Sequence, residues 1–364
     1  MPSRPLCPPS RPAAPAPAGL AVDIVKKLDA FTLRVSFTAG QGTLALLGAS
    51  GCGKSMTLQC IAGIARPDEG RITLNGRVLF DSARHIDLPP QKRKVGYLFQ
   101  QYALFPNMTV EQNVLAGVRT GAPAARRAAA RAVLHSFGLD GLENARPSHL
   151  SGGQQQRAAL ARILVGQPEA LLLDEPFSAL DEYLKWQLEL ELADTLARFG
   201  GSTVFVSHNR DEVYRLCRSV CVLERGRADP QVPLHTLFSD PATVGAARIS
   251  GCKNLTPAVA APGGMLDCPG WGVRLQTDRP LPPGVCWAGI RAHYFRTDDG
   301  PNPIPCTVDR VVENVFSTVV MLRTPGGGLL RMEQEKAVWA ALGLGPGAPL
   351  TLHIRPADVM PLLE

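Results

Sequence analysis

A glycine-rich segment carries the residue types that bind phosphate. It consists of Gly48, Ala49, Ser50, Gly51, Cys52, Gly53, Lys54 and Ser55, and it satisfies the pattern G-x-x-x-x-G-K-[ST]. An apolar run at 43–47 precedes it as a strand, and the spacing of Met56, Leu58 and Ile61 predicts a helix after it. Backbone N–H groups at such a strand-to-helix turn favour anions. We expect a nucleotide site of these residues and Met56, with Lys54 on the β and γ phosphates and Ser55 on Mg²⁺.

A second chemical signal is a pair of acids at the end of an apolar run. Residues 171–173 are all leucine, and Asp174 and Glu175 follow them directly. Asp174 can hold Mg²⁺ through water, and Glu175 can polarise an attacking water molecule. An acidic loop after a core strand is the alternative, which the glycine-rich segment upstream disfavours.

A third segment opens a helix with small and polar residues. Ser151, Gly152, Gly153 and Gln154 precede the helical run 154–164. Such a start offers a hydroxyl and exposed N–H groups to an anion. An ordinary helix cap is the alternative, so the position between the other two motifs is what makes this segment informative.

These motifs occur in the order found in the ATPase subunits of ABC transporters, which the chain resembles over about residues 20–245. The matching segments are the glycine loop, Gln100 in 97–100, 150–157, 171–176, 178–181 and His208. The resemblance implies a head-to-tail homodimer in which Ser151 and Gly153 of one subunit close on the γ-phosphate held by Lys54 of the other.

The resemblance also implies roles for three further residues. Gln100 would contact Mg²⁺ and the attacking water, and His208 would contact the γ-phosphate. Phe31 is the candidate for stacking on adenine, with a core phenylalanine on a strand face as the alternative. ATP and Mg²⁺ are therefore the expected ligands, and ATP hydrolysis is the expected reaction.

Two more regions resemble parts of ABC importers. The run 102–106 is similar to the groove that receives a helix of the membrane permease, with core packing as the alternative. Residues 289–293 are similar to the small β domain that follows the ATPase in bacterial uptake systems. The implied partners are permease subunits and, through them, an extracytoplasmic solute-binding protein, at the cytoplasmic face of the membrane.

Three short segments indicate the cargo by resemblance. They are 88–93, 250–255 and 313–316, and they look like parts of bacterial molybdate and sulfate importer ATPases. Molybdate is the first hypothesis, with sulfate, tungstate and ferric iron as alternatives. The C-terminal domain could itself bind the anion through Lys253 or Ser317, although a purely structural barrel is the favoured interpretation.

The elements that position these motifs predict two units in a chain of 364 residues. Strands separated by helices indicate an α/β core with a parallel sheet, an antiparallel edge sheet and a helical subdomain at about 101–162. We assign 20–248 to this ATPase domain and 251–364 to an OB-like β domain, where Pro and Gly become frequent. Residues 1–19 are rich in Pro and Ala and are expected to be a disordered extension.

Composition narrows the class of protein. Apolar residues make up 45% of the chain, but charges or prolines interrupt every run that might span a bilayer. The net charge of +6 allows a nucleic-acid or ribosome-associated ATPase as a rival. That class carries long coiled coils or two cassettes, which this sequence lacks, so we expect no nucleic acid. The nine cysteines are scattered along the chain, which fits a reducing compartment. Cys217 and Cys221 are four residues apart on an expected helix and could share a metal ion, although two ligands alone make a weak site.

Overall fold

The computed structural model describes residues 19–178 and 182–364. The expected N-terminal extension, apart from Gly19, and residues 179–181 of the motif at 178–181 lie outside the described residues. Contacts divide the chain into two compact units, Met1–Gln231 and Val232–Glu364. This division falls ahead of the boundary near residue 250 that composition indicates, because two short helices group with the C-terminal unit.

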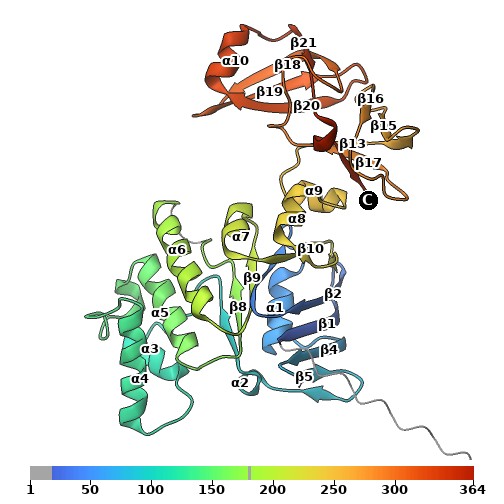
Figure 1. The fold of residues 1–364 in the computed structure, drawn as a ribbon. Coiled ribbons are helices and arrows are strands. Elements are labelled where there is room, and N and C mark those ends of the chain that lie inside the picture. The colour runs from blue at the N-terminus through green and yellow to red at the C-terminus, as the bar shows by residue number, and fades with distance from the viewer. Residues whose placement is uncertain (1–18, 179–181) are drawn as a thin grey trace, which may run out of the picture. The chain divides into compact units, whose positions relative to one another are not determined.

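The first unit is built on a mixed sheet whose strand order is β6-β5-β4-β1-β2-β11-β10-β3-β9-β8-β7 (Figure 1). Its strands are β1 (Leu20–Lys27), β2 (Thr32–Ala39), β3 (Gly42–Leu47), β4 (Glu69–Leu74), β5 (Arg77–Asp81), β6 (Ile86–Asp87), β7 (Val95–Leu98), β8 (Ala170–Asp174), β9 (Ser202–Ser207), β10 (Ser219–Glu224) and β11 (Arg227–Ala228). Strands β10, β3, β9, β8 and β7 pair in parallel, whereas β2, β1, β4, β5 and β6 pair antiparallel. The predicted parallel core with an antiparallel edge sheet is confirmed.

The parallel strands are apolar along their length because both faces of this part of the sheet are covered. Every residue of β8 and β9 is buried, and so is β3 after its first residue. Helix α1 (Lys54–Ala62) packs on one face, where Leu58 and Ile61 join Leu46, Leu172 and Val204 in one core cluster. Alternation returns in β2, where one face alone is buried.

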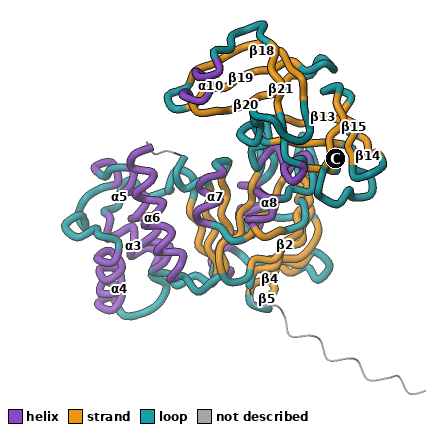
Figure 2. Tube along the Cα trace, turned by 45° about the horizontal axis from the view of Figure 1, so that its top comes forward, coloured by secondary structure: helices purple, strands orange, loops and turns teal. Residues whose placement is uncertain are grey.

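The remaining helices of this unit are α2 (Pro90–Arg93), α3 (Val110–Gly117), α4 (Pro123–Ser136), the 3-10 turn Pro147–His149, α5 (Gly152–Leu164), α6 (Glu182–Arg198) and α7 (Arg210–Leu216). Figure 2 shows α3, α4, α5 and α6 gathered to one side of the sheet. Val114, Leu134 and Ala158 bind α3, α4 and α5 to one another through a separate small core. This is the helical subdomain that the sequence predicts.

The second unit is a β domain with short helices. It begins with β12 (Val232–Pro233), α8 (Leu234–Ser239) and α9 (Val244–Ile249), and it contains α10 (Lys336–Leu342) and the 3-10 turn Pro356–Asp358. Its strands β13 (Asn254–Pro257), β17 (Trp287–Ile290) and β22 (Met360–Leu362) form one sheet; β14 (Val259–Ala261), β15 (Met265–Cys268) and β16 (Val273–Gln276) form another; β20 (Leu329–Glu335), β19 (Ser317–Arg323), β18 (Ile304–Glu313) and β21 (Pro349–Leu352) form a third. Trp271, Phe295 and Ile304 are buried at its centre.

The prediction that Cys217 and Cys221 share a helix face is wrong. Helix α7 ends before Cys217, and Cys221 lies in β10. Burial raises the pKa of the Cys221 thiol to about 12, so it behaves as a small core residue. Within 19–178 and 182–364, no three His, Cys, Asp or Glu side chains gather as metal ligands. In the same ranges, no helix is both long and apolar enough to span a bilayer.

A fully buried arginine fixes α1 from its C-terminal end. Arg93 donates from Nη1 to the carbonyl oxygens of Cys60 and Ile61, at 2.8 and 2.9 Å. Its Nε donates to the Leu88 carbonyl at 2.6 Å, and its Nη2 pairs with Asp87 at 2.8 Å. A cation at a helix C-terminus is favourable because the last carbonyls lack a following turn; the Cys60 carbonyl otherwise accepts from the N–H of the capping residue Gly63, at 3.3 Å. The helix whose first residue is Lys54 is therefore anchored at its C-terminal end.

We predict that Arg93→Met lowers the free energy of unfolding by roughly 2–4 kcal/mol, because several buried acceptors lose their donor. Urea unfolding followed by circular dichroism provides the measurement. Arg66→Met is the matched control: Arg66 is 69% exposed and contacts the same Asp87 at 3.7 Å. That change should cost under about 1 kcal/mol. Equal losses in the two variants would contradict the role given to Arg93.

Candidate active site

The glycine loop joins β3 to α1 and requires glycine at two of its positions for steric reasons. A Cβ on Gly48 would lie 2.2 Å from the carbonyl oxygen of Leu223, which is too close for any side chain. Gly53, at the start of α1, has φ of 109°, in the left-handed region that favours glycine. The close approach of β10 and this backbone turn therefore dictate the shape of the loop.

The ammonium group of Lys54 lies inside this loop. Lys54 is 5% exposed, and its Nζ donates to the carbonyl oxygens of Gly48 at 2.8 Å and Ala49 at 2.9 Å. Cys52 is buried beside it, and burial raises the pKa of the Cys52 thiol, so the thiol stays neutral. The loop thus holds one positive charge at its centre, with no acid among the contacts of Lys54 in the described part of the chain.

The carboxylate of Asp174 accepts hydrogen bonds from two hydroxyl groups. Ser55 Oγ donates to Oδ1 at 2.9 Å, and Tyr97 Oη donates to Oδ2 at 2.8 Å. Burial raises the pKa of Asp174, and the hydrogen bonds from Tyr97 and Ser55 oppose that shift. Ser55 and Asp174 are two of the three residues that the sequence predicts at the metal, with Gln100, and the structure brings these two together across 119 residues of sequence.

The donor set of this pair suits Mg²⁺. A serine hydroxyl and an aspartate carboxylate are oxygen ligands, which hard divalent cations prefer. They lie within hydrogen-bond distance of each other beside the glycine loop, as a cation shared with phosphate requires. The residues therefore fit a Mg²⁺ ion held by Ser55 and Asp174.

Glu175 and His208 meet at the ends of β8 and β9. Glu175 Oε1 lies 3.3 Å from Nδ1 of His208, whose side chain is 64% exposed. The backbone of Glu175 has φ of 45°, a strained conformation for this residue type, and its N–H donates to the Val206 carbonyl at 3.0 Å. This turn directs the carboxylate away from the sheet and toward the exposed histidine.

The segment before His208 is fixed by a buried carboxylate. Ser207 Oγ donates to Glu212 Oε2 at 2.6 Å, and Lys185 of α6 pairs with the other oxygen of Glu212. Asn209 caps α7 by accepting from the N–H groups of Asp211 and Glu212. His208 is thus the exposed residue of an otherwise constrained turn.

The helix start at Ser151 forms a complete capping box. Ser151 Oγ accepts from the N–H of Gln154 at 3.3 Å, and Gln154 Oε1 accepts from the N–H of Ser151 at 2.9 Å. Ser151 is exposed and Gly153 is buried. Among the described residues, neither contacts Lys54, so one chain alone does not bring this segment to the glycine loop.

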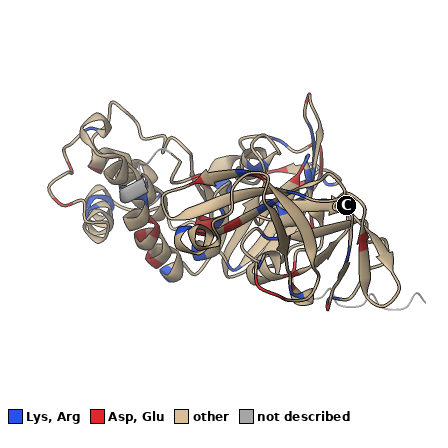
Figure 3. Cartoon of the chain, turned by 90° about the horizontal axis from the view of Figure 1, so that it is seen from above, with Lys and Arg blue, Asp and Glu red and all other residues tan. Residues whose placement is uncertain are grey.

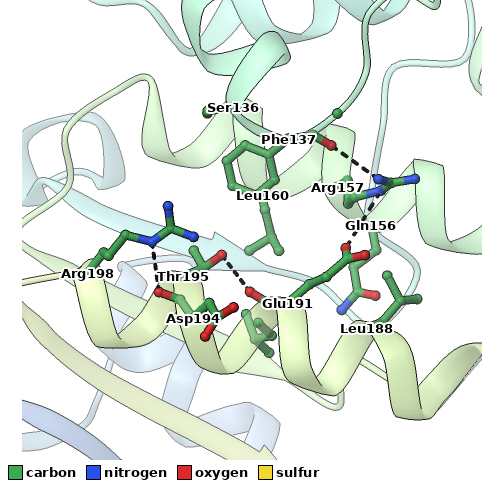
Figure 4. A pocket seen from close by; sticks show the side chains of 12 residues that line it. Ser136, Phe137, Gln156, Arg157, Leu160, Leu188, Glu191, Asp194, Thr195 and Arg198 are labelled. Carbon is green, nitrogen blue, oxygen red and sulfur yellow. Dashed lines mark hydrogen bonds and ion pairs between the residues drawn. The ribbon is translucent and has the colours of Figure 1, made fainter.

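Behind this helix start, a 260 Å³ pocket separates α5 from α6 (Figure 4). Arg157 spans it, donating from Nη1 to the Phe137 carbonyl at 3.3 Å and approaching Glu191 at 3.9 Å. The amide of Gln156 is buried, and its two polar atoms have no hydrogen-bond partner in the described part of the chain. The helical subdomain is therefore joined to α6 less tightly than β8 is joined to its neighbouring strands.

Two predicted site residues lie apart from this cluster. Gln100 is exposed after β7, and its side chain makes no hydrogen bond within 19–178 or 182–364. Phe31 is partly buried and covers Gly226, where an added Cβ would lie 2.4 Å from its ring. The packing of Phe31 matches the alternative of a core side chain, and its place against adenine stays a prediction.

The run 102–106 contributes one residue to a surface groove and one to the core. Phe105 is 46% exposed, lies 5.3 Å from the Arg162 guanidinium, and lines a 510 Å³ groove with Tyr97 and Arg119. Tyr102 is instead buried, and its hydroxyl donates to the Pro176 carbonyl at 3.2 Å. The groove is lined mainly by β7, α3 and α5.

The candidate anion ligands of the second unit are poorly arranged for that purpose. Ser317 Oγ donates to the carboxylate of Glu333 at 3.0 Å, so an acid occupies the position where an anion would bind. Lys253 is exposed, next to the buried Cys252. This geometry favours the structural interpretation of the domain.

Tyr97 is the residue of the site that the motifs did not reveal. It stands three positions before Gln100 in the segment 97–100, but its type alone gives no indication of a role. Its role follows only from the pairing of its strand with β8, which the structure shows and no local sequence pattern encodes.

Comparison with known proteins places this site in a family. A family model described as ABC transporter matches residues 32–178. A molybdenum import ATP-binding protein, ModC, of Paramagnetospirillum magneticum is 40% identical over 61% of this chain and 61% of its own length. A spermidine/putrescine import ATP-binding protein, PotA, of Rubrobacter xylanophilus is 37% identical over 84% of this chain and 82% of its own. An Fe(3+) ions import ATP-binding protein, FbpC, of Haemophilus influenzae is 38% identical over 62% and 64%.

A solved structure supports the same family. The ATP-binding cassette MJ0796, in a dimeric post-hydrolysis state bound to ADP and Pi, is 27% identical with a TM-score of 0.50, covering 59% of this chain and 98% of that one. The chain spans about three fifths of the length of the molybdenum relatives it matches, 61% and 60% for two of them. The predicted resemblance is confirmed, and the chain belongs to the ATP-binding proteins of the ABC transporter family.

Proposed function

We propose that this protein is the ATP-hydrolysing subunit of an ABC importer, working as a homodimer on a separate membrane permease. The observation that carries the proposal is the convergence of Lys54, the Ser55–Asp174 pair and the Glu175–His208 pair at the carboxyl ends of β3, β8 and β9. Ligands of open α/β sheets bind at this edge. Phosphate, cation and water thus each have a candidate partner.

The proposed chemistry is transfer of the γ-phosphoryl group of ATP to water. Lys54 and the loop N–H groups would bind the phosphates, and Ser55 and Asp174 would hold Mg²⁺, which when bound would supply positive charge to the phosphate oxygens. Glu175 accepts a proton from the attacking water, and His208, 3.3 Å from Glu175, contacts the γ-phosphate. Gln100, which stands apart from this cluster after β7, is proposed to contact Mg²⁺ and the attacking water when nucleotide is bound. The products are ADP and inorganic phosphate.

The site needs a second copy of the chain. Among the described residues, Ser151 and Gly153 make no hydrogen bond with Lys54, whose ammonium donates to the Gly48 and Ala49 carbonyls. Their helix start can offer backbone N–H groups to an anion. In the proposed dimer they close on the γ-phosphate bound by the partner's loop. ATP then favours closure and hydrolysis favours opening, which converts the reaction into motion.

The permease is proposed to dock on the groove beside Phe105. Phe105 is a large apolar side chain, half-exposed at its edge, and Arg162 fixes the neighbouring loop by donating to the Tyr102 and Ala103 carbonyls. An amphipathic helix suits such a surface. We accordingly propose that the protein works at the cytoplasmic face of the membrane and communicates through the permease with an extracytoplasmic solute-binding protein.

A nucleic-acid-associated ATPase is the rival class, and charge distribution argues against it. Figure 3 shows Lys and Arg positions interspersed with Asp and Glu positions along the described ribbon. Nucleic-acid binding relies on a concentrated basic patch. The net charge of +6 is therefore a weak argument for such a partner.

For the cargo we propose molybdate, with sulfate, tungstate and ferric iron as alternatives. The support is the 40% identity to molybdenum import ATP-binding proteins over 61% of this chain. A polyamine is a second candidate, because the spermidine/putrescine relatives match across 80–84% of this chain and so include much of the second unit. The cargo pocket itself belongs to the partner proteins.

We predict that Glu175→Gln retains ATP binding but lowers hydrolysis by roughly 10²- to 10⁴-fold, because the amide cannot accept the proton. Phosphate release and equilibrium binding of ATP provide the two measurements. Glu169→Gln is the matched control, since Glu169 precedes the same strand at its opposite end and pairs with Lys94. Hydrolysis by the Glu175 variant at the rate of the Glu169 variant would refute the assignment.

We predict that a strain deleted for this protein loses uptake of labelled molybdate and regains it with the intact chain but not with the Glu175→Gln chain. Uptake of spermidine, ferric iron and sulfate is measured in parallel. Unchanged molybdate uptake with loss of another solute would transfer the proposal to that solute. No change in any uptake would contradict the importer function.

A further inference from the structure

Tyr97 reaches the metal-site carboxylate because of the register between two parallel strands. Tyr97 of β7 pairs with Leu172 of β8, so the two side chains lie on the same face of the sheet. Asp174 is two residues beyond Leu172 and therefore on that face too. The phenol ring extends along the strand direction, and its hydroxyl meets Asp174 Oδ2 at 2.8 Å.

The strand that carries Tyr97 has little freedom to shift. An added Cβ on Gly96 would lie 2.3 Å from the Ile163 side chain, so α5 packs directly on the backbone there. The ring of Tyr97 meets the ring of Phe99 edge to face, with centroids 4.2 Å apart. Packing thus fixes the position of the hydroxyl independently of its hydrogen bond.

The two oxygens of Asp174 have different partners as a result. Oδ2 accepts from Tyr97 and Oδ1 accepts from Ser55. A carboxylate without the first contact is free to rotate about its terminal torsion, which is broad for aspartate. With that contact, Oδ1 stays beside the Ser55 hydroxyl. Oδ1 of Asp174 and Oγ of Ser55 are then both available to a cation.

We propose that Tyr97 is a positioning residue for the divalent cation of the nucleotide site, acting through its hydrogen bond to Asp174. The inference rests on the proposed function, because it concerns the cation that accompanies ATP. Hydrogen bonds to ligating carboxylates commonly set metal affinity, and their loss costs about 10- to 100-fold. Tyr97 therefore affects binding of the cation more than binding of the nucleotide.

The test is Tyr97→Phe, which removes one oxygen and keeps the ring contact with Phe99. ATP binding is measured by calorimetry, once in EDTA and again at a series of Mg²⁺ concentrations. At the same Mg²⁺ concentrations, the rate of phosphate release is measured. We expect ATP affinity in EDTA within about twofold of the wild type, and a half-saturating Mg²⁺ concentration raised roughly 10-fold or more. Tyr214→Phe, the same change at a 60% exposed tyrosine of α7, should leave both values unchanged.

Two results would overturn the inference. One is an unaltered Mg²⁺ dependence in Tyr97→Phe. The other is an equal loss of ATP affinity with and without Mg²⁺, together with a lower melting temperature, which would make Tyr97 a structural residue only. Failure of the proposed function gives a different result, because the wild-type protein would then bind no ATP in either medium.

Discussion

The buried parallel strand β8 is the constraint on which the rest of the site depends. Its five residues, Ala170–Asp174, are all buried between β7 and β9, so they must be apolar until the strand leaves the sheet. The first polar residue, Asp174, therefore stands at the carboxyl edge. Since β3 and β9 run in the same direction, the glycine loop and His208 emerge at this edge as well.

At this edge the polar groups satisfy one another. The ammonium of Lys54 bonds to loop carbonyls, and the Ser55 hydroxyl bonds to Asp174. Buried polar groups left without partners would cost about 1–3 kcal/mol each, so these contacts stabilise the loop in its observed shape. Under the proposed function, a phosphate or cation would exchange partners within a site that is already ordered, which would limit the ordering cost of binding.

Much of this architecture was predictable because local patterns determine it. The glycine loop, the apolar run before Asp174 and the cap at Ser151 each combine a residue pattern with an element boundary. The contact of Tyr97 with Asp174 was not predictable, because it depends on the register between two strands separated by the helical subdomain. No local pattern encodes that register.

The errors have a related cause. Cys217 and Cys221 have helical spacing, but α7 ends before Cys217 and the chain enters β10. Tyr102 looks like a groove residue by its neighbours, but the turn at φ of 57° directs its side chain into the core. In each case a backbone turn between elements, rather than residue type, determined where the side chain went.

Tyr97 also links the edge strand beside the Phe105 groove to the carboxylate of Asp174. Residue 97 is among those that line the groove, and its hydroxyl donates to Asp174 Oδ2. Because the Tyr97 ring packs edge to face against the Phe99 ring, a shift of β7 would move the hydroxyl with the strand. Under the proposed function, a permease helix seated in the groove would therefore act on the Asp174 carboxylate through β7, without needing to touch the nucleotide.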